Sequence, residues 1–184
     1  MSDSYTQIVV LCEGKQDGVF LRRFLVRSGV NSDRIRIRGY PAGRGSGKHF
    51  VQEEYAKEVE AHRKRAAKMN IGLIVMQDCD EATVEATRAS LEESAMRRKD
   101  ERIALFFPRR NIETWIHFLI NGDEVDESKA YPKLARESEC HEAVDRMAEK
   151  PEYRLSSKVP HSLRAACAEI RRLFPEKRCV DSIE

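Results

Sequence analysis

The sequence has few of the patterns that build a disulfide framework or a cysteine- and histidine-based metal site. Its five cysteines are odd in number and contain no C-x-x-C pair. Its five histidines show neither H-x-H nor H-E-x-x-H spacing. These absences remove support for a zinc ribbon, a disulfide scaffold and a histidine-built metal centre, and they predict reduced thiols.

Long hydrophobic runs are also missing, and none approaches the length of a membrane-spanning helix. The opening MSDSYTQIVVLCEGK has no basic segment before its short apolar run, so it does not read as a signal peptide. We therefore expect a soluble, cytoplasmic protein that makes no membrane contact.

Neither sign of charge is in clear excess, with 33 lysines and arginines against 31 acids and a net charge of +2. A surface that binds nucleic acid would therefore have to be local. The 184 residues are 41% hydrophobic, which is enough to form the core of one domain.

Short apolar runs alternate with helical patterns along the first 120 residues. Runs at 6–12 (TQIVVLC) and 72–77 (GLIVMQ) are typical of strands buried on both faces. Residues 34–40 (RIRIRGY) alternate strictly, which predicts a half-exposed strand near a sheet edge. Residues 102–107 (RIALFF) predict a further strand.

The remaining periodic segments predict helices at 17–27, 48–69, 83–98, 112–120, 139–148 and 162–174, the last with Ser162 as a candidate N-cap. Strands that alternate with helices predict an α/β fold with a mostly parallel β-sheet flanked by helices. We expect residues 1–120 to form this α/β domain. Residues 121–184 would form a helical C-terminal extension packed on it.

Acidic residues follow two of the predicted strands directly. Glu13 and Asp17 follow the first buried strand, and Asp78 and Asp80 follow the second. Ligand sites of parallel sheets lie at these carboxyl ends, and on an extended backbone Asp78 and Asp80 would project to the same side. Converging carboxylates suit Mg²⁺ or Mn²⁺, although Asp17 or Asp80 could instead cap a helix.

The segments VLCEGKQD and IVMQDCDE resemble the two motifs of the Toprim domain, the metal-binding module of topoisomerases, bacterial primases and OLD-family nucleases. The resemblance covers about residues 7–107 and implies a Toprim or Rossmann-like fold. It implies that Glu13 acts as acid/base or metal ligand, with Asp17 completing the first motif. Asp78 and Asp80 would hold magnesium.

A later segment, FFPRRNIETW, resembles small stand-alone Toprim-like proteins related to the OLD nucleases. This resemblance implies that Glu113 is a ligand of a second metal ion. Lys158, in RLSSKVPHS, matches the lysine that OLD-type nucleases place near the scissile phosphate. The family further implies anti-phage defence, a separate ATPase subunit for any nucleotide regulation, and a homodimer.

The glycine-rich stretch YPAGRGSGKH, residues 40–49, raises the question of a nucleotide-binding P-loop. The P-loop pattern requires glycine at position 42 and a hydroxyl at position 49, where this chain has Ala42 and His49. We interpret the stretch as a loop whose Arg44 and Lys48 contact a substrate phosphate. A plain glycine-rich connection is the alternative.

Arg109 and Arg110 directly follow the strand at 102–107. Their guanidinium groups suit a phosphate, with Arg110 or Lys158 stabilising its charge, but salt bridges to the acidic residues are equally compatible. The leading hypothesis is a metal-dependent endonuclease that acts on nucleic acid, with DNA favoured over RNA. Maturation of structured RNA and a non-catalytic subunit that binds metal and a partner are the alternatives.

Overall fold

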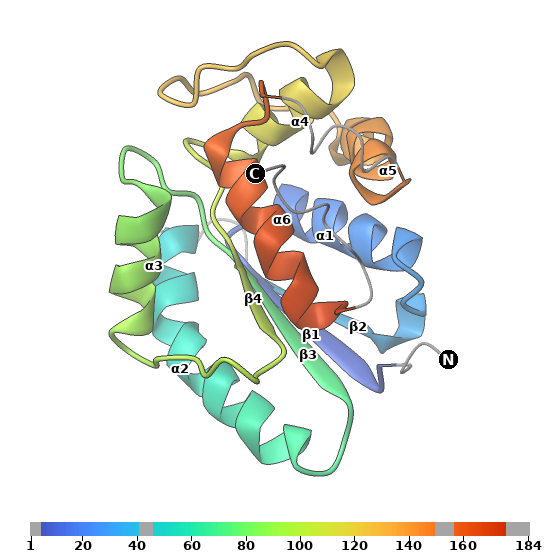
Figure 1. The fold of residues 1–184 in the computed structure, drawn as a ribbon, viewed down its shortest axis with the longest axis vertical. Helices are drawn as coiled ribbons and strands as arrows, with labels where there is room; N and C mark the ends of the chain where they lie inside the picture. The colour runs from blue at the N-terminus through green and yellow to red at the C-terminus, as the bar shows by residue number, and fades with distance from the viewer. Residues whose placement is uncertain (1–4, 41–45, 150–156, 176–184) are drawn as a thin grey trace.

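A parallel β-sheet forms the centre of the molecule in the computed structural model, which describes residues 5–40, 46–149 and 157–175. The sheet has four strands in the order β2-β1-β3-β4, and each neighbouring pair is parallel (Figure 1). The strands are β1 (Gln7–Cys12), β2 (Ile35–Gly39), β3 (Ile71–Met76) and β4 (Ile103–Phe106). The prediction of an α/β fold with a parallel sheet flanked by helices is confirmed.

Helices cover both faces of the sheet because β1 alternates its side chains between two cores. Ile8 and Val10 pack toward one core, and Val9 and Leu11 toward the other. The helices of the first core are α1 (Lys15–Arg27), α4 (Ile112–Asn121), α5 (His141–Glu149) and α6 (His161–Leu173). The helices of the second core are α2 (Gly47–Ala66) and α3 (Val84–Glu92). Two short 3-10 helices, η1 (Ser32–Arg34) and η2 (Glu137–Cys140), are also present.

Strand β2 lies at one edge of the sheet, as its alternating sequence predicts. Ile35 is buried, whereas Arg36 is exposed. Arg38 turns toward α2 and pairs with Glu54 at 2.9 Å and with Glu58. Arg36 is therefore directed to solvent, Arg38 forms the ion pairs that fix the edge strand to α2, and Arg34 donates to the Tyr5 carbonyl at 2.7 Å.

The C-terminal helix α6 returns to the sheet and packs against β4 (Figure 1). The Tyr5 hydroxyl donates a hydrogen bond to the Leu173 carbonyl, and the Tyr5 ring meets Phe174 edge-on at 5.8 Å. The prediction of Ser162 as the N-cap is wrong, since Pro160 holds that position. Trp115 Nε1 donates to Ser162 Oγ at 2.7 Å instead, because the buried indole N–H needs an acceptor.

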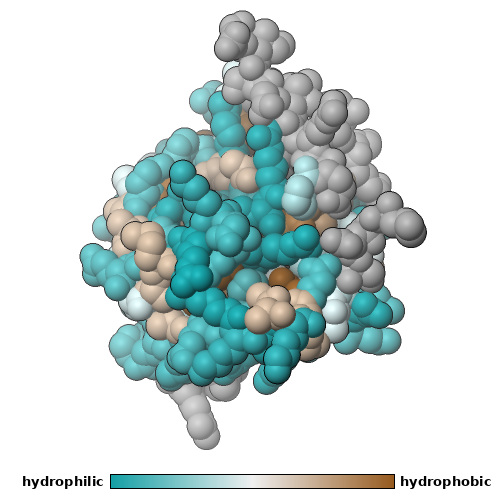
Figure 2. Space-filling model, turned by 60° about the horizontal axis from the view of Figure 1, so that its bottom comes forward, coloured by the Kyte–Doolittle hydropathy of each residue, from teal (hydrophilic) through white to brown (hydrophobic). Residues whose placement is uncertain are grey.

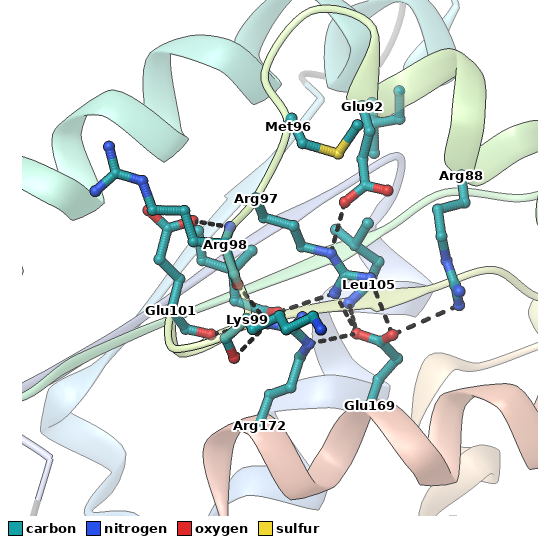
Figure 3. A network of polar contacts seen from close by, with 12 residues as sticks. Arg88, Glu92, Met96, Arg97, Arg98, Lys99, Glu101, Leu105, Glu169 and Arg172 are labelled. Carbon is teal, nitrogen blue, oxygen red and sulfur yellow. Dashed lines mark hydrogen bonds and ion pairs between the residues drawn. The ribbon is translucent and has the colours of Figure 1, made fainter.

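A buried ion cluster joins α6 to α3 and to the free edge of β4 (Figure 3). Arg97 donates to Glu92 at 2.8 Å and pairs bidentately with Glu169, and its side chain is only 5% exposed. Glu169 also accepts the Leu105 N–H at 3.1 Å, and Arg97 donates to the Ile103 carbonyl at 3.0 Å. The cluster therefore provides hydrogen-bond partners for the Ile103 carbonyl and the Leu105 N–H, which β4 would otherwise leave unpaired at the edge of the sheet.

Helix α3 ends at Glu92, well before the predicted end at residue 98. The chain leaves the helix there, and Arg97 reaches the ion cluster at the edge of β4. Within the described residues, no helix combines the length and the apolar character required to cross a membrane.

Candidate metal centre

Two acidic segments leave the sheet side by side at the carboxyl ends of β1 and β3. These strands are parallel neighbours, with Cys12 in register with Met76. The Asp78 N–H donates to Glu13 Oε1 at 3.0 Å. This hydrogen bond holds the first acidic residue against the loop that carries Asp78, so the two motifs meet as the parallel-sheet rule predicts.

Asp17 lies in the first turn of α1, where the Gly14 N–H donates to its Oδ2 at 3.0 Å. The residue is therefore a helix-capping group as well as a member of the acidic cluster. Burial, together with the charge of Glu113, raises the pKa of Asp17 to about 7, although backbone hydrogen bonds from Gly14 and Glu13 oppose the shift. The helix-capping role and the role in the acidic cluster, both considered from the sequence, are thus compatible for Asp17.

Glu113 occupies the first turn of α4 and is buried. Burial raises its pKa, while its own backbone N–H, the charge of Lys133 and the backbone of Leu134 oppose the shift. Its charge in turn raises the pKa values of Asp17 and Asp78. The structure therefore brings a residue from a distant helix into the same electrostatic cluster as the two acidic segments after β1 and β3.

Asp78 is the most perturbed carboxyl of this group. Burial raises its pKa to about 9, and the charges of Asp17, Glu13, Glu113 and Asp80 add to the rise in that order. Burial, followed by the charge of Asp17, also raises the pKa of Glu13 to about 7. These carboxyls are close enough to repel one another in a site that solvates them poorly.

The oxygen Asp78 Oδ1 is buried and has no hydrogen-bond partner among the described residues. A buried acceptor without a partner carries a desolvation cost that a bound cation would remove. The donors around it are carboxylate oxygens, which are the hard ligands that Mg²⁺ and Mn²⁺ prefer. The residue types therefore suit a divalent cation, with Glu13, Asp17, Asp78 and Glu113 as the candidate ligands. In the described part of the chain, no group of three or more histidine, cysteine, aspartate or glutamate side chains is placed so that it could hold a metal ion.

Asp80 differs from the arrangement expected for an extended D-x-D segment. Strand β3 ends at Met76, and Asp80 has a left-handed backbone with φ of 53°. Its side chain is 62% exposed and pairs with Lys48 Nζ at 2.9 Å. The turn therefore separates the partly buried Asp78 from the exposed Asp80 at the mouth of the site, although the charge of Asp80 still raises the pKa values of Glu13 and Asp78.

The glycine-rich stretch ends against the acidic cluster. A Cβ on Gly47 would lie 2.5 Å from the Glu13 carbonyl oxygen, so only glycine fits this contact without a shift of the backbone. The contact places the first turn of α2, with Lys48, beside Glu13, and the charge of Lys48 lowers the pKa of Glu13. Residues 41–45, which include Arg44, lie outside the described residues.

Three further basic residues were expected at a phosphate. The Cys79 N–H donates to the Pro108 carbonyl at 2.8 Å, which ties the exit of β3 to the segment that carries Arg109 and Arg110. Arg110 has φ of 64° and pairs with Glu81 at 3.3 Å, and Arg109 Nε is buried without a hydrogen-bond partner among the described residues. Lys158 lies in an exposed turn before α6, and its role at a phosphate stays a prediction.

Lys133 is a member of the site that the sequence did not reveal. It is exposed, and its charge lowers the pKa values of Asp17 and Glu113. It belongs to the charged and poorly periodic stretch after residue 121, which contains no motif that would have singled it out. Only the packing of this stretch beside α1 and α4 assigns it to the acidic cluster.

Comparison of the chain with family models, with curated proteins and with solved structures finds no match. The fold and the site are those of an α/β protein with a parallel sheet and a partly buried group of carboxyls at the carboxyl ends of its central strands.

The raised pKa values predict a specific pH dependence in metal-free protein. Since the folded state binds more protons at these carboxyls than the unfolded state, their contribution to the free energy of unfolding falls as pH rises. For Asp78 this loss runs from its ordinary pKa of 3.8 to its raised pKa of about 9. In EDTA, the melting temperature of Asp78→Asn should therefore exceed that of wild type by a margin that grows from about pH 5 to about pH 9. Thermal melts test this, and a margin that is constant or shrinks with pH would contradict it.

Proposed function

We propose that this protein is a metal-dependent endonuclease that hydrolyses phosphodiester bonds of nucleic acid. The observation that carries the proposal is the partly buried Asp78, whose Oδ1 is buried without a hydrogen-bond partner among the described residues and whose pKa is raised by burial and by the charges of neighbouring carboxyls. Glu13, Asp17, Asp78 and Glu113 would hold one or two Mg²⁺ or Mn²⁺ ions, with Asp80 as a further ligand from the mouth of the site.

A cation bound there would supply Lewis-acid activation of water and stabilisation of the leaving oxygen. The protein's own groups would do the rest. Glu13 has a pKa of about 7 and is oriented by the Asp78 N–H at 3.0 Å, so in place of binding the metal it could act as the general base that accepts a proton from the attacking water. A carboxylate that serves as general base works best when its pKa lies close to the working pH.

Basic residues around the carboxylates would hold the substrate phosphate. Lys48 and Arg110 pair with Asp80 and Glu81, whose side chains are 62% and 89% exposed. Exposed ion pairs contribute little stability, so both cations could exchange their partner for a phosphate at low cost. Arg109 brings a buried guanidinium nitrogen without a hydrogen-bond partner among the described residues, and Arg44 and Lys158 remain candidates from the sequence.

The preference for DNA over RNA rests on the resemblance of the E-G-x-x-D and D-x-D segments to the Toprim domain. The same resemblance supports a cytoplasmic setting in defence against foreign DNA. A separate ATPase subunit and a homodimer belong to the proposal on the same ground. Functions transferred by fold and motif need a direct assay.

Cleavage of supercoiled plasmid and of a structured RNA, each with Mg²⁺, with Mn²⁺ or with EDTA, tests the proposal. We expect nicking or linearisation of the plasmid with either metal, slower cleavage of the RNA, and no cleavage in EDTA. Faster cleavage of the RNA would select the RNA-maturation alternative. If neither substrate is cut although calorimetry detects metal binding, the non-catalytic alternative replaces the nuclease.

A further inference from the structure

A cavity lies at the opposite end of the sheet from the acidic residues. It is bordered by the end of α2, by the start of β3 and by the segment that precedes β4, and its volume is about 730 Å³. Figure 2 views the molecule from this lower end, where most of the surface is hydrophilic and hydrophobic atoms are visible in a hollow. The volume lies within the range of small-molecule sites, about 300–1,000 Å³.

Positive charge predominates around this cavity. Arg63, Lys68, Arg98 and Arg102 contribute four cationic side chains to its lining, against two acids. One of those acids, Glu101, already accepts from Arg63 at 2.5 Å and from the Arg98 N–H at 2.6 Å. Its charge is therefore largely compensated within the protein, and the cavity keeps a net attraction for anions.

His62 adds a buried polar group to the wall. His62 is only 6% exposed, and neither of its ring nitrogens makes a hydrogen bond of ordinary geometry with the described residues. Burial lowers its pKa, although the nearby Ile71 backbone opposes the shift. A neutral imidazole has one N–H donor and one acceptor nitrogen, so His62 can donate to a ligand in the cavity.

The wall that carries Arg98 is held in place before any ligand binds. The Arg172 guanidinium donates to the Arg98 carbonyl at 3.0 Å and to the Glu101 carbonyl at 3.1 Å (Figure 3). Arg102 donates to Asn70 Oδ1 at 2.8 Å and lies over the Tyr5 ring. A site ordered in advance loses less conformational entropy when it binds a ligand.

Apolar residues, among them Ala66, Ala67 and Ile71, line the cavity together with the cations. The space is far larger than a phosphate group needs, and its lining combines anion-binding and apolar surface. We infer that the cavity binds a small phosphate-bearing molecule of mononucleotide size. Its phosphate contacts Lys68, Arg98 and His62, and its less polar part packs against Ala67 and Ile71. The site is separate from the acidic cluster and does not depend on nuclease activity.

Isothermal titration calorimetry in EDTA, with inorganic phosphate, pyrophosphate and adenosine monophosphate as probes, tests this inference. Wild type should bind adenosine monophosphate more tightly than inorganic phosphate. The double variant Lys68→Ala/Arg98→Ala should weaken binding at least about tenfold, since both side chains carry charge to the phosphate. Lys64→Ala is the matched control, because Lys64 lies one turn before Lys68 but pairs with Glu60 and does not line the cavity.

His62→Gln should also weaken binding. Lys68 and Arg98 are exposed, so the double variant keeps the test valid if the His62 variant does not fold. Asp78→Asn should bind the probes as wild type does. The inference is overturned if wild type binds none of the three probes or if the double variant binds them unchanged. It also fails if Asp78→Asn abolishes binding of the probes. A single-stranded oligonucleotide, titrated in the same way, is a further check: the inference fails if the oligonucleotide alone binds and the double variant weakens that binding.

Discussion

Asp78→Asn is expected to reduce metal-dependent plasmid cleavage by about 10³-fold or more, since the loss of a metal ligand removes several kcal/mol of transition-state stabilisation. Asparagine keeps the size of the side chain but replaces one carboxylate oxygen by an NH2 group, which donates hydrogen bonds and cannot bind a cation. Asp78 is surrounded by Asp17, Glu13 and Glu113, so its charge is central to the cluster that would attract the cation. Initial rates of nicking at saturating Mg²⁺, and metal affinity from calorimetry, measure the effect.

Asp33→Asn is the matched control, because Asp33 is exposed in η1, before β2 begins. It should cut plasmid at the wild-type rate. The folded state of the Asp78 variant can be verified in the same samples, since loss of repulsion should preserve or raise its melting temperature in EDTA. A folded Asp78→Asn variant that retains wild-type cleavage would remove the acidic cluster from the proposed chemistry.

Glu169→Gln is expected to lower the free energy of unfolding by about 3–5 kcal/mol, because it leaves the Arg97 guanidinium buried without its main counter-charge. The Arg97 side chain is 5% exposed, and Glu169 also accepts the Leu105 N–H at the edge of β4. For a domain of this size, such a loss lowers the melting temperature by about 6–20 °C. Urea denaturation and thermal melts measure both quantities.

Glu60→Gln provides the control, since the Lys64–Glu60 pair lies on the solvent face of α2 with both side chains more than two-thirds exposed. Exposed pairs of this kind often contribute nothing measurable. The double variant Arg97→Met/Glu169→Gln should lose less stability than Glu169→Gln alone, because it also removes the uncompensated cation. If Glu169→Gln and Glu60→Gln prove equally mild, the cluster does not join α6 to the sheet as described.

The strands were predictable from the sequence because their surroundings are simple. The run at 6–12 has apolar side chains on both faces, and β1 is indeed buried between two helical layers. The alternation at 34–40 has one apolar face, and β2 lies at the sheet edge. Helix ends were less predictable, since the end of α3 and the role of Ser162 depend on partners distant in the sequence, Glu169 and Trp115.

The sequence by itself determined the order of strands and helices, and it determined that Glu13, Asp17, Asp78 and Asp80 follow buried strands. It could do so because hydrophobic periodicity and the position of acids after a strand are local properties. The tertiary structure decided which acids lie together: it brings the partly buried Asp78 near the buried Glu113, while a turn leaves Asp80 exposed. It also placed Lys133 near the cluster, and it gave the edge of β4 its hydrogen-bond partners Arg97 and Glu169. Burial and the interaction of distant charges arise only when distant segments pack together.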